Sequence, residues 1–291
     1  MIAAMLPASI EREVKGSGGP IVFLTGAGIS AESGIPTFRG PEGYWRVGSR
    51  SYQPTEMATA VAFAQMPDEV WRWYLYRRRV CRSAAPNQAH RALVDLEQQL
   101  GDRFVLVTQN VDGLHLRAGQ SPGRTYQVHG NIHSCRCVRG CAPAVRPLPE
   151  TIDAAWTQAP HLTDAERRAL RCACGERLRP HVLWFDESYD EPLYRYVSAL
   201  RAAETAAALV VVGTSGATTL PARMCEMVAA RGVPLIVVDP EPTVFTSLAE
   251  ASRSGLVLRG TACETVPALA EALAELVVRT PSGLSPDDGL R

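Results

Sequence analysis

The sequence has almost no lysine and no net charge. Of its 30 basic residues all but Lys15 are arginine, and 30 acidic residues balance them, so the formal net charge is zero. Neutrality removes the general attraction that draws basic proteins to nucleic acid or to anionic membranes. We therefore expect neither a nucleic-acid partner nor a membrane, and any ligand must be recognised by a local group of side chains.

Long apolar runs and a secretory leader are also missing. No stretch reaches the ~20 apolar residues that a membrane span needs, and the N-terminus lacks the basic start and long apolar run of a secretory signal. The 291 residues, 46% of them hydrophobic, are enough for one large domain, or a large and a small one. We expect a folded cytoplasmic protein.

Short apolar runs rich in β-branched residues recur along the chain and indicate buried parallel strands. They lie at residues 21–28, 104–110, 209–215 and 234–239. Helical patterns separate them, at residues 67–80, 87–100, 192–206, 221–231 and 264–278. Strands that alternate with helices predict an α/β fold, a doubly wound parallel sheet of the Rossmann-like type.

Two segments interrupt this alternation and predict a second, smaller domain. Residues 1–40, 85–130 and 181–279 are assigned to the Rossmann-like domain. A helical insertion, residues 41–84, and a cysteine-containing module, residues 131–180, are assigned to the small domain. The turn-rich tail, residues 280–291, is predicted to be disordered.

The first strand leads into Gly26-Ala27-Gly28-Ile29-Ser30-Ala31, a G-x-G-x-x-A pattern that suits a pyrophosphate at a helix N-terminus. Alone the pattern is weak, because a tight strand-to-helix turn without a ligand has the same sequence. A dehydrogenase would continue into a helix and a second strand ending in an acidic residue. Here residues 32–45 carry three glycines and two prolines, which predicts a long loop over the cofactor and argues against simple hydride transfer.

Five of the eight cysteines fall within forty residues, which in a reducing compartment favours a metal site over disulfides. Cys137-x3-Cys141 and Cys172-x-Cys174 supply four thiolates for one structural zinc ion. Such a closed site leaves no open position for substrate, so catalytic zinc is not expected. Cys135 competes with Cys137 as a ligand, and thiols without metal are the alternative reading.

Five motifs in this order carry a resemblance to a known family. They are GAGIS-AESGIPTFRG, TQNVDGLH (108–115), VHG (128–130), LRPHVLWFDE (178–187) and GTS (213–215). The chain resembles the sirtuin family of NAD-dependent protein deacylases over about residues 18–278. The resemblance implies NAD as co-substrate and a structural zinc ion, and it favours Cys137 over Cys135 by distance from His129.

Catalytic and NAD-binding roles follow from the resemblance. His129, after the strand-like TYQV, becomes the general base that deprotonates a ribose hydroxyl, and Asn110 helps to position the attack. Gln109, Asn110 and Asp112 also stand where a strand ends, the usual edge for ligands. Asp239 replaces the asparagine usual in sirtuins. The implied NAD-binding residues are Gly26, Ala27, Gly28, Ser30, Ala31, Thr37, Phe38, Arg39, Gln109, Asn110, Asp112, Gly213, Thr214, Ser215, Asp239 and Cys263.

Tyr74 and Arg77 lie three residues apart, hence on one helix face. An arginine fork and a tyrosine hydroxyl could together read an acidic acyl chain; an amphipathic helix with solvated arginines is the alternative. The segment MATAVAFAQMPDEVWRWYLYRRR is similar to the desuccinylase branch, class III. That similarity implies that the pair binds the acyl carboxylate and that Ala58 widens the pocket. Thr37, which stands where many sirtuins have aspartate, also favours the desuccinylase branch.

Substrate residues are also expected after the motif histidine of LRPHVLWFDE. Val182, Trp184 and Phe185 are expected to form the edge on which an acyl-lysine peptide or protein adds as a strand, with main-chain hydrogen bonds that tolerate many sequences. Asp186 stands where sirtuins usually have glycine. Its carboxylate either favours basic residues in the substrate or tightens the loop, and the sequence leaves both readings open.

The resemblance implies an NAD-dependent protein-lysine deacylase that prefers succinyl, malonyl or glutaryl groups, also removes acetyl, and yields nicotinamide and O-acyl-ADP-ribose. One alternative is an ADP-ribosyltransferase or NAD hydrolase on the same scaffold. Another is a non-enzymatic, NAD-sensing zinc-ribbon module. Residues 117–181 give the latter some support with ten arginines against five acidic residues, although Tyr126 and Trp156 are the only stacking aromatics there.

Overall fold

The computed structural model describes residues 6–36, 45–47, 50–149, 151–152 and 161–278. Three predicted NAD-binding residues, Thr37, Phe38 and Arg39, lie outside the described residues. So do the predicted disordered tail, residues 280–291, and most of the predicted loop that follows the first glycine-rich turn.

Six parallel strands form the main sheet, in the order β11-β10-β9-β1-β4-β5. Their bounds are β1 Ile21–Thr25, β4 Phe104–Thr108, β5 Thr125–Gln127, β9 Ala208–Val212, β10 Leu235–Val238 and β11 Gly255–Leu258. The predicted doubly wound α/β fold is confirmed. Strand β11 was not predicted, because four residues at a sheet edge, three of them only half-buried, make no long apolar run.

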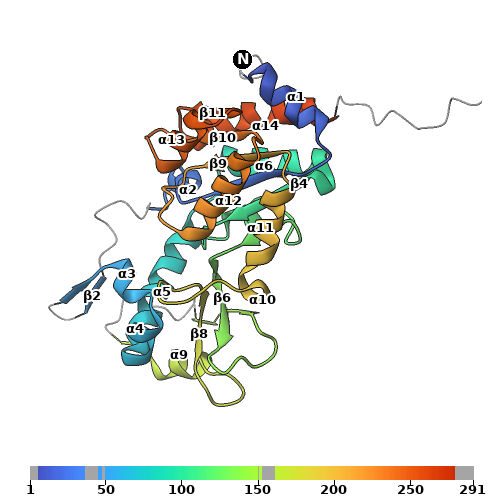
Figure 1. The fold of residues 1–291 in the computed structure, drawn as a ribbon. Coiled ribbons are helices and arrows are strands. Elements are labelled where there is room, and N and C mark those ends of the chain that lie inside the picture. Colours follow the sequence, from blue (N-terminus) through green and yellow to red (C-terminus); the bar gives the residue numbers. More distant parts are fainter. Residues whose placement is uncertain (1–5, 37–44, 48–49, 150, 153–160, 279–291) are drawn as a thin grey trace, which may run out of the picture.

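Helices cover both faces of this sheet (Figure 1). Along β1, Ile21 and Phe23 join one core cluster and Val22 and Leu24 the other, as the alternation of side chains in a strand requires. The first face is covered by α1 (Ala8–Gly16), α6 (Gln88–Leu100) and α14 (Ala262–Val278). The second is covered by α11 (Tyr196–Thr205), α12 (Thr219–Ala230) and α13 (Val244–Ala251).

The helix predicted at residues 192–206 is in fact two. A short helix, α10 (Glu191–Tyr194), ends where Arg195 adopts a left-handed backbone with φ of 53°, and α11 begins at the next residue. A left-handed residue cannot continue an α-helix, and a non-glycine residue gives no warning of it in the sequence. The break turns the chain between β8 and the second face of the sheet.

A second group of elements lies beyond the main sheet (Figure 1). Three antiparallel strands, β6 (Gly130–Cys137), β7 (Arg146–Pro147) and β8 (Leu178–Val182), form a sheet in the order β7-β6-β8. With them lie α3 (Pro54–Met57), α4 (Ala60–Gln65), α5 (Pro67–Ser83), α9 (Asp164–Ala169) and the hairpin β2 (Trp45–Val47) and β3 (Arg50–Tyr52). Short elements elsewhere are α2 (Gly28–Ala31), α7 (Leu114–Ala118) and the 3-10 turn Gly101–Arg103.

The second group has a hydrophobic core of its own. That core joins Met57 and Trp71 of the first predicted insertion to Ile132 and Leu178 of the second. The Trp71 indole N–H also donates to the Leu178 carbonyl at 2.9 Å. Two segments distant in sequence thus share one core, although the exact domain boundaries stay a prediction. No helix in the part of the chain that the structure describes is long and apolar enough to cross a membrane.

The turns after β1 and β9 touch through their backbones. The Gly28 N–H donates to the Gly213 carbonyl at 2.8 Å, and a Cβ on Gly28 would stand 2.6 Å from the Gly213 Cα. Gly213 itself has φ of 58°. The glycine pattern is therefore required by the packing of two strand ends, before any ligand is considered.

We expect Gly28→Ala to destabilise the protein by about 2 kcal/mol, because the new methyl group must push one turn away from the other. Thermal unfolding monitored by circular dichroism measures the change. The matched control is Gly18→Ala, where an added Cβ meets nothing within 4 Å. Equal melting temperatures for the two variants would contradict the packing argument.

Candidate functional site

Residues from four motifs meet at the carboxyl edge of the main sheet. Strands β10, β9, β1 and β4 are neighbours in the sheet, and Thr25, Thr108 and Val212 end their strands at the same level. The residues that follow, Gly26, Gln109, Gly213 and, after β10, Asp239, therefore line one edge. Open parallel sheets bind ligands at this edge.

Asn110 belongs to a network beneath the glycine-rich turn. Its Nδ2 donates to the Gly26 carbonyl at 2.9 Å and lies 3.2 Å from the Ser30 hydroxyl. Ser30 donates to Asp112 at 2.7 Å, and Asp112 accepts a second bond from the Leu114 N–H at 2.8 Å. Asp112 is buried, and desolvation raises the pKa of its carboxyl group. Ser30 and Asp112 thus hold the turn and Asn110 in place.

Gln109 joins the ends of β4 and β9. Its Nε2 donates to the Thr214 hydroxyl at 2.8 Å, and its Oε1 accepts from Thr218 at 3.1 Å. Ser215 follows Thr214 in the same loop, while Ala27 directly precedes the short helix α2 and Ala31 is its last residue. The sheet therefore brings the predicted glycine-turn residues, Gln109 and the loop after β9 together.

His129 stands between β5 and β6, at the junction of the two groups of elements. Its Nδ1 lies 3.0 Å from the Gln109 carbonyl oxygen, which can only accept, so Nδ1 carries the proton. Nε2 therefore has the lone pair. Desolvation lowers the pKa of His129 to about 4, so the imidazole is neutral at pH 7. Nε2 is a base aimed away from the Gln109 backbone.

Asp239 and Cys263 lie farther along the sheet, beyond β9. Asp239 is buried and accepts a bond from the Glu241 N–H at 3.0 Å. Cys263, at the start of α14, donates its backbone N–H to Glu32 at 2.9 Å, and Thr261 donates to the same carboxylate at 3.1 Å. Glu32 was not predicted from the sequence, since 231 residues separate it from Cys263 and no local pattern connects them.

Tyr74 and Arg77 are placed together on α5, near the loop after β8. The buried Tyr74 oxygen accepts from the Trp184 indole N–H at 2.9 Å, so the phenol proton remains to be donated. Burial raises the pKa of Tyr74, while the charge of Arg77 opposes that rise. The Arg77 guanidinium lies 4.9 Å from the centre of the Trp73 ring. Arg77 is thus a cation packed beside a neutral phenol, not a fully solvated one.

The loop after β8 is fixed at both ends. Val182 closes β8, and the buried Trp184 ring is covered by the Arg179 guanidinium at 3.3 Å from its centre. Arg179 forms an ion pair with Glu187, and the Glu187 carboxylate also accepts from the Trp184 backbone N–H at 3.0 Å. Phe185, in contrast, is 60% exposed.

Asp186 ties this loop to the helical insertion. Its carboxylate accepts from the Ala60 N–H at 2.8 Å and the Val61 N–H at 3.2 Å, at the start of α4. Next to it, the Phe185 N–H donates to the Ala58 carbonyl at 3.0 Å. Of the two readings of Asp186 that the sequence left open, these bonds favour a tightened loop. Ala58 itself is buried against the same core as Tyr74.

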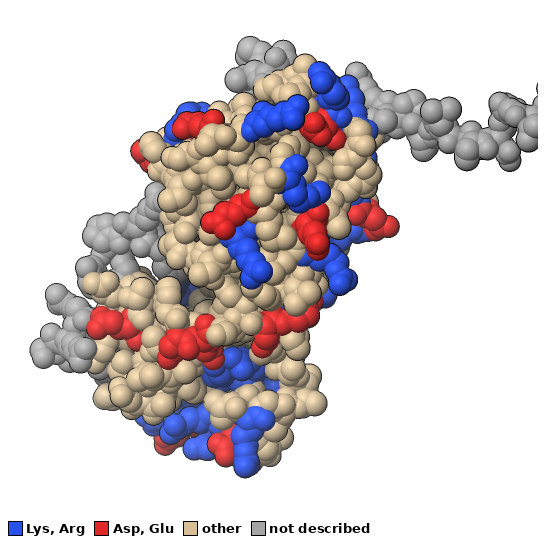
Figure 2. Space-filling view, viewed as in Figure 1, with Lys and Arg blue, Asp and Glu red and all other residues tan. Residues whose placement is uncertain are grey.

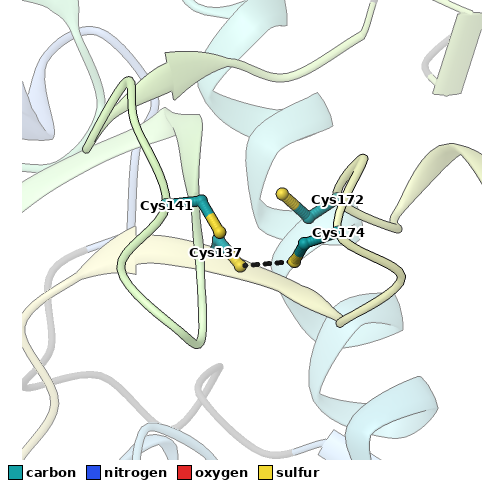
Figure 3. Close-up of side chains that lie close together, drawn as sticks. All are labelled: Cys137, Cys141, Cys172 and Cys174. Carbon is teal, nitrogen blue, oxygen red and sulfur yellow. Dashed lines mark hydrogen bonds between the residues drawn. The ribbon is translucent and has the colours of Figure 1, made fainter.

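The four thiols of Cys137, Cys141, Cys172 and Cys174 all lie within 4.8 Å of one another (Figure 3). The sulfur atoms of Cys137 and Cys174 are 3.7 Å apart. Tetrahedral zinc with Zn–S bonds of about 2.3 Å places its sulfurs ~3.8 Å apart, so the donor set and spacing fit one structural zinc ion. Hydrogen bonding to the Cys174 backbone lowers the pKa of Cys172 to about 6, which favours the thiolate that zinc binds.

Cys135 is not in this group. Its sulfur is buried and lies 3.9 Å from the Pro147 carbonyl oxygen, and burial raises its pKa to about 11. The structure thus places Cys137, and not Cys135, beside the other three cysteines.

Many arginines of residues 117–181 have carboxylate partners. The paired residues are Arg124, Arg136, Arg139, Arg167 and Arg179. On the face drawn in Figure 2, acidic and basic groups are interspersed over the main sheet, and basic groups gather toward the end that holds α9. Pairing lowers the positive charge available to a phosphate backbone, which weakens the nucleic-acid alternative.

These features define a class: a nucleotide-binding α/β protein with a four-cysteine zinc module attached beyond the sheet edge. The model of the Sir2 family matches residues 26–219, and the chain belongs to this family.

Relatives agree with this assignment. The chain is 42% identical to an "NAD-dependent protein deacylase" of Thermus thermophilus over 241 residues, 81% of this chain and 86% of that protein. It is 39% identical to "NAD-dependent protein deacylase sirtuin-5, mitochondrial" of Danio rerio over 239 residues, 78% and 75% of the two chains.

Solved structures are similar over nearly the whole chain. A Sir2 homologue in complex with NAD has a TM-score of 0.71 and 34% identity, covering 93% of this chain and 94% of that one. A Sir2 protein with a p53 peptide and NAD+ has a TM-score of 0.68 and 26% identity, covering 91% and 97%.

We expect the purified protein to hold one zinc ion per chain and Cys141→Ala to lose it, because three thiolates leave the tetrahedral site incomplete. Metal analysis gives the stoichiometry, and thermal unfolding gives the accompanying loss of stability. Cys135→Ala is the matched control and is expected to keep its zinc. Retention of zinc by Cys141→Ala together with its loss from Cys135→Ala would reverse the ligand assignment.

Proposed function

We propose that this chain is an NAD-dependent protein-lysine deacylase that prefers acidic acyl groups, such as succinyl, malonyl and glutaryl. The observation that carries the proposal is that a candidate base and a candidate acyl-binding pair stand on either side of the place where the main sheet meets the second group of elements. A neutral histidine base, His129, stands at the sheet edge, and the Tyr74 and Arg77 pair stands on the packed helix α5. The names of the chain's relatives support the deacylase activity in this proposal.

NAD would lie along the carboxyl edge of the sheet. The turn at Gly26–Ala31 suits the pyrophosphate, with Gln109, Asn110 and Asp112 toward the nicotinamide and its ribose. Gly213, Thr214 and Ser215 would face phosphate and ribose hydroxyls, with Asp239 and Cys263 toward the adenosine. NAD supplies an ADP-ribosyl group that the acyl oxygen of a modified lysine captures as nicotinamide leaves.

His129 would act on the ribose. Its Nε2 lone pair can take the proton of a ribose hydroxyl, and the Nδ1 bond to the Gln109 carbonyl holds the ring in the tautomer that this requires. Asn110, fixed by the Gly26 carbonyl, would orient the ribose for attack. The deprotonated hydroxyl would attack the captured acyl carbon, and one water would complete cleavage of the bond from that carbon to the lysine nitrogen. Acyl-lysine, NAD and water would thus give free lysine, nicotinamide and O-acyl-ADP-ribose.

The acyl chain would point toward α5. Arginine offers two parallel N–H donors to a carboxylate, and the Tyr74 hydroxyl adds a third donor. Because Trp184 already donates to the Tyr74 oxygen, the phenol can only donate onward. The small Ala58 leaves room for a longer chain. An acetyl group would gain nothing from these donors, which is the physical basis of the proposed preference.

The acyl-lysine peptide would add as a strand beside Val182, Trp184 and Phe185. The Trp184 and Phe185 N–H groups already donate to Glu187 and Ala58, so the peptide would bond to backbone carbonyls of this loop beside the exposed Phe185 ring. Such main-chain hydrogen bonds do not depend on the sequence of the peptide. The ties from Asp186 to α4 and from Glu187 to Trp184 keep this edge rigid before substrate arrives.

Incubation with NAD and acetyl-, succinyl- or glutaryl-lysine peptides tests the activity. We expect deacylated peptide and O-acyl-ADP-ribose in equal amounts, with succinyl or glutaryl removed at least about 10-fold more efficiently than acetyl, since each charge-assisted hydrogen bond contributes about 1.5 kcal/mol or more. Mass spectrometry follows both products. A peptide that gains ADP-ribose, or NAD consumed without change in the peptide, would show a transferase or a hydrolase instead.

Arg77→Met should lower kcat/KM for succinyl-lysine by roughly 10- to 100-fold, because the acyl carboxylate loses its charged partner. Activity on acetyl-lysine should change less than about threefold. The control is Arg72→Met on the same helix, whose native side chain pairs with Glu69 at 2.8 Å. Steady-state kinetics with both peptides decide the matter, and an equal loss on both acyl groups would argue for a structural role of Arg77.

A further inference from the structure

Tyr189 occupies the free nitrogen of the proposed base. Its hydroxyl lies 2.8 Å from His129 Nε2, although sixty residues separate the two in sequence. Since Nδ1 bears the proton that faces the Gln109 carbonyl, Nε2 can only accept, and Tyr189 is the donor. Tyr189 comes from the loop between β8 and α10, and its sequence context gave no reason to single it out.

We propose that Tyr189 is a positioning residue that holds His129 Nε2 in the free protein and yields that position to a ribose hydroxyl when NAD binds. The inference rests on the proposed role of His129 as base. In this arrangement Tyr189 orients the imidazole before NAD arrives and opposes NAD binding, and it makes no contribution once the ribose is in place.

Competition for Nε2 follows from the chemistry of imidazole. The nitrogen has one lone pair in the plane of the ring, which accepts one strong hydrogen bond. The tyrosine hydroxyl and a ribose hydroxyl cannot both donate to it. Proton removal from the ribose therefore requires that Tyr189 leave Nε2 first.

Thr218 offers the Tyr189 hydroxyl a second hydrogen-bond acceptor. Thr218, the residue before α12, lies beside the Tyr189 side chain, and its own hydroxyl proton goes to Gln109 Oε1 at 3.1 Å. The Thr218 oxygen can thus accept from the phenol that Nε2 releases. A hydroxyl placed between two acceptors can move from one to the other without becoming unpartnered in the interior.

The surroundings keep Tyr189 a donor. Burial raises the pKa of Tyr189 to about 12, so it stays protonated at neutral pH. The centre of its ring lies 5.6 Å from the ring centre of Tyr196 on α11 and 5.8 Å from that of His129. The Tyr196 hydroxyl accepts from Arg223 of α12 at 3.1 Å, and no carboxylate contributes to the pKa of either Tyr189 or His129 within the described residues.

Tyr189→Phe tests the inference, because it removes the hydroxyl and keeps the ring. We expect NAD to bind about 2- to 10-fold more tightly by calorimetry, with kcat unchanged, since one competing hydrogen bond is lost from the free protein only. The acid limb of kcat/KM for NAD should move to higher pH, because the donor that favoured neutral His129 is gone. The acid limb of kcat should stay in place.

Tyr196→Phe is the matched control. It removes the hydroxyl of the stacked neighbour, which faces Arg223 and not His129, and should leave NAD affinity and both pH limbs unchanged. Unchanged or weaker NAD binding by Tyr189→Phe, or a lower kcat with an unmoved acid limb of kcat/KM, would overturn the proposal.

A measurement without turnover separates this inference from the proposed function. In the wild-type protein labelled with 15N-histidine, the His129 Nε2 resonance, assigned with His129→Asn, should shift on addition of ADP-ribose. It should also differ between the free wild-type protein and Tyr189→Phe. A resonance insensitive to both changes would overturn the role of Tyr189, even if deacylation is observed. Absent deacylation with both shifts present would reject the proposed function and leave the contact intact.

Discussion

Parallel register at the centre of the main sheet is the constraint on which the candidate site depends. Because β1 pairs with both β4 and β9, and all three end at the level of Thr25, the residues that follow arrive at one edge. The backbone contact between Gly28 and Gly213 then sets how closely the turns approach. Asn110 and Gln109 bond to these turns directly, so the positions of their side chains follow from the sheet.

The second group of elements depends on the site edge in a different way. Strand β6 begins at Gly130, directly after His129, and β8 pairs beside it, so the antiparallel sheet starts at His129 and extends away from the main sheet. The helix α5 is held against β8 by Trp71 and against the next loop by Tyr74. The indole hydrogen bonds of Trp71 and Trp184 therefore fix α5, and with it the proposed acyl pocket, against β8 and the loop that follows.

Much of this could be predicted because it depends on local patterns. The β-branched runs gave four of the strands, and strand ends gave Gln109, Asn110 and Gly213 as neighbours, since the edge of a parallel sheet gathers them. The glycine pattern itself was ambiguous. Close packing against the turn after β9 and close approach of a pyrophosphate both require residues without a Cβ atom. The cysteine pattern alone left Cys135 and Cys137 open as ligands, and the resemblance favoured Cys137 by its distance from His129. The structure places Cys137 with the other three cysteines.

The rest depends on contacts that sequence proximity does not encode. Tyr189 reaches His129 from the loop after β8, which Asp186 ties to α4 and which precedes the break of the chain at Arg195. A left-handed arginine and a carboxylate at two backbone N–H groups leave no pattern that periodicity could reveal. Glu32 beneath α14 is a similar case, where a carboxylate meets a helix start from the far end of the chain.

Burial acts in opposite senses on the two sides of the proposed site, and both outcomes suit its chemistry. At His129 desolvation disfavours the cation, so the imidazole keeps its lone pair at neutral pH. At Tyr74 it disfavours the anion, so the phenol keeps the proton that it would donate. Arginine keeps its charge when it is buried, whereas the pKa of a buried lysine falls readily. An arginine at position 77 therefore suits the proposed carboxylate-binding role better than a lysine would. A neutral protein can therefore carry one local positive charge toward an acidic acyl group without a general field that would attract anions elsewhere.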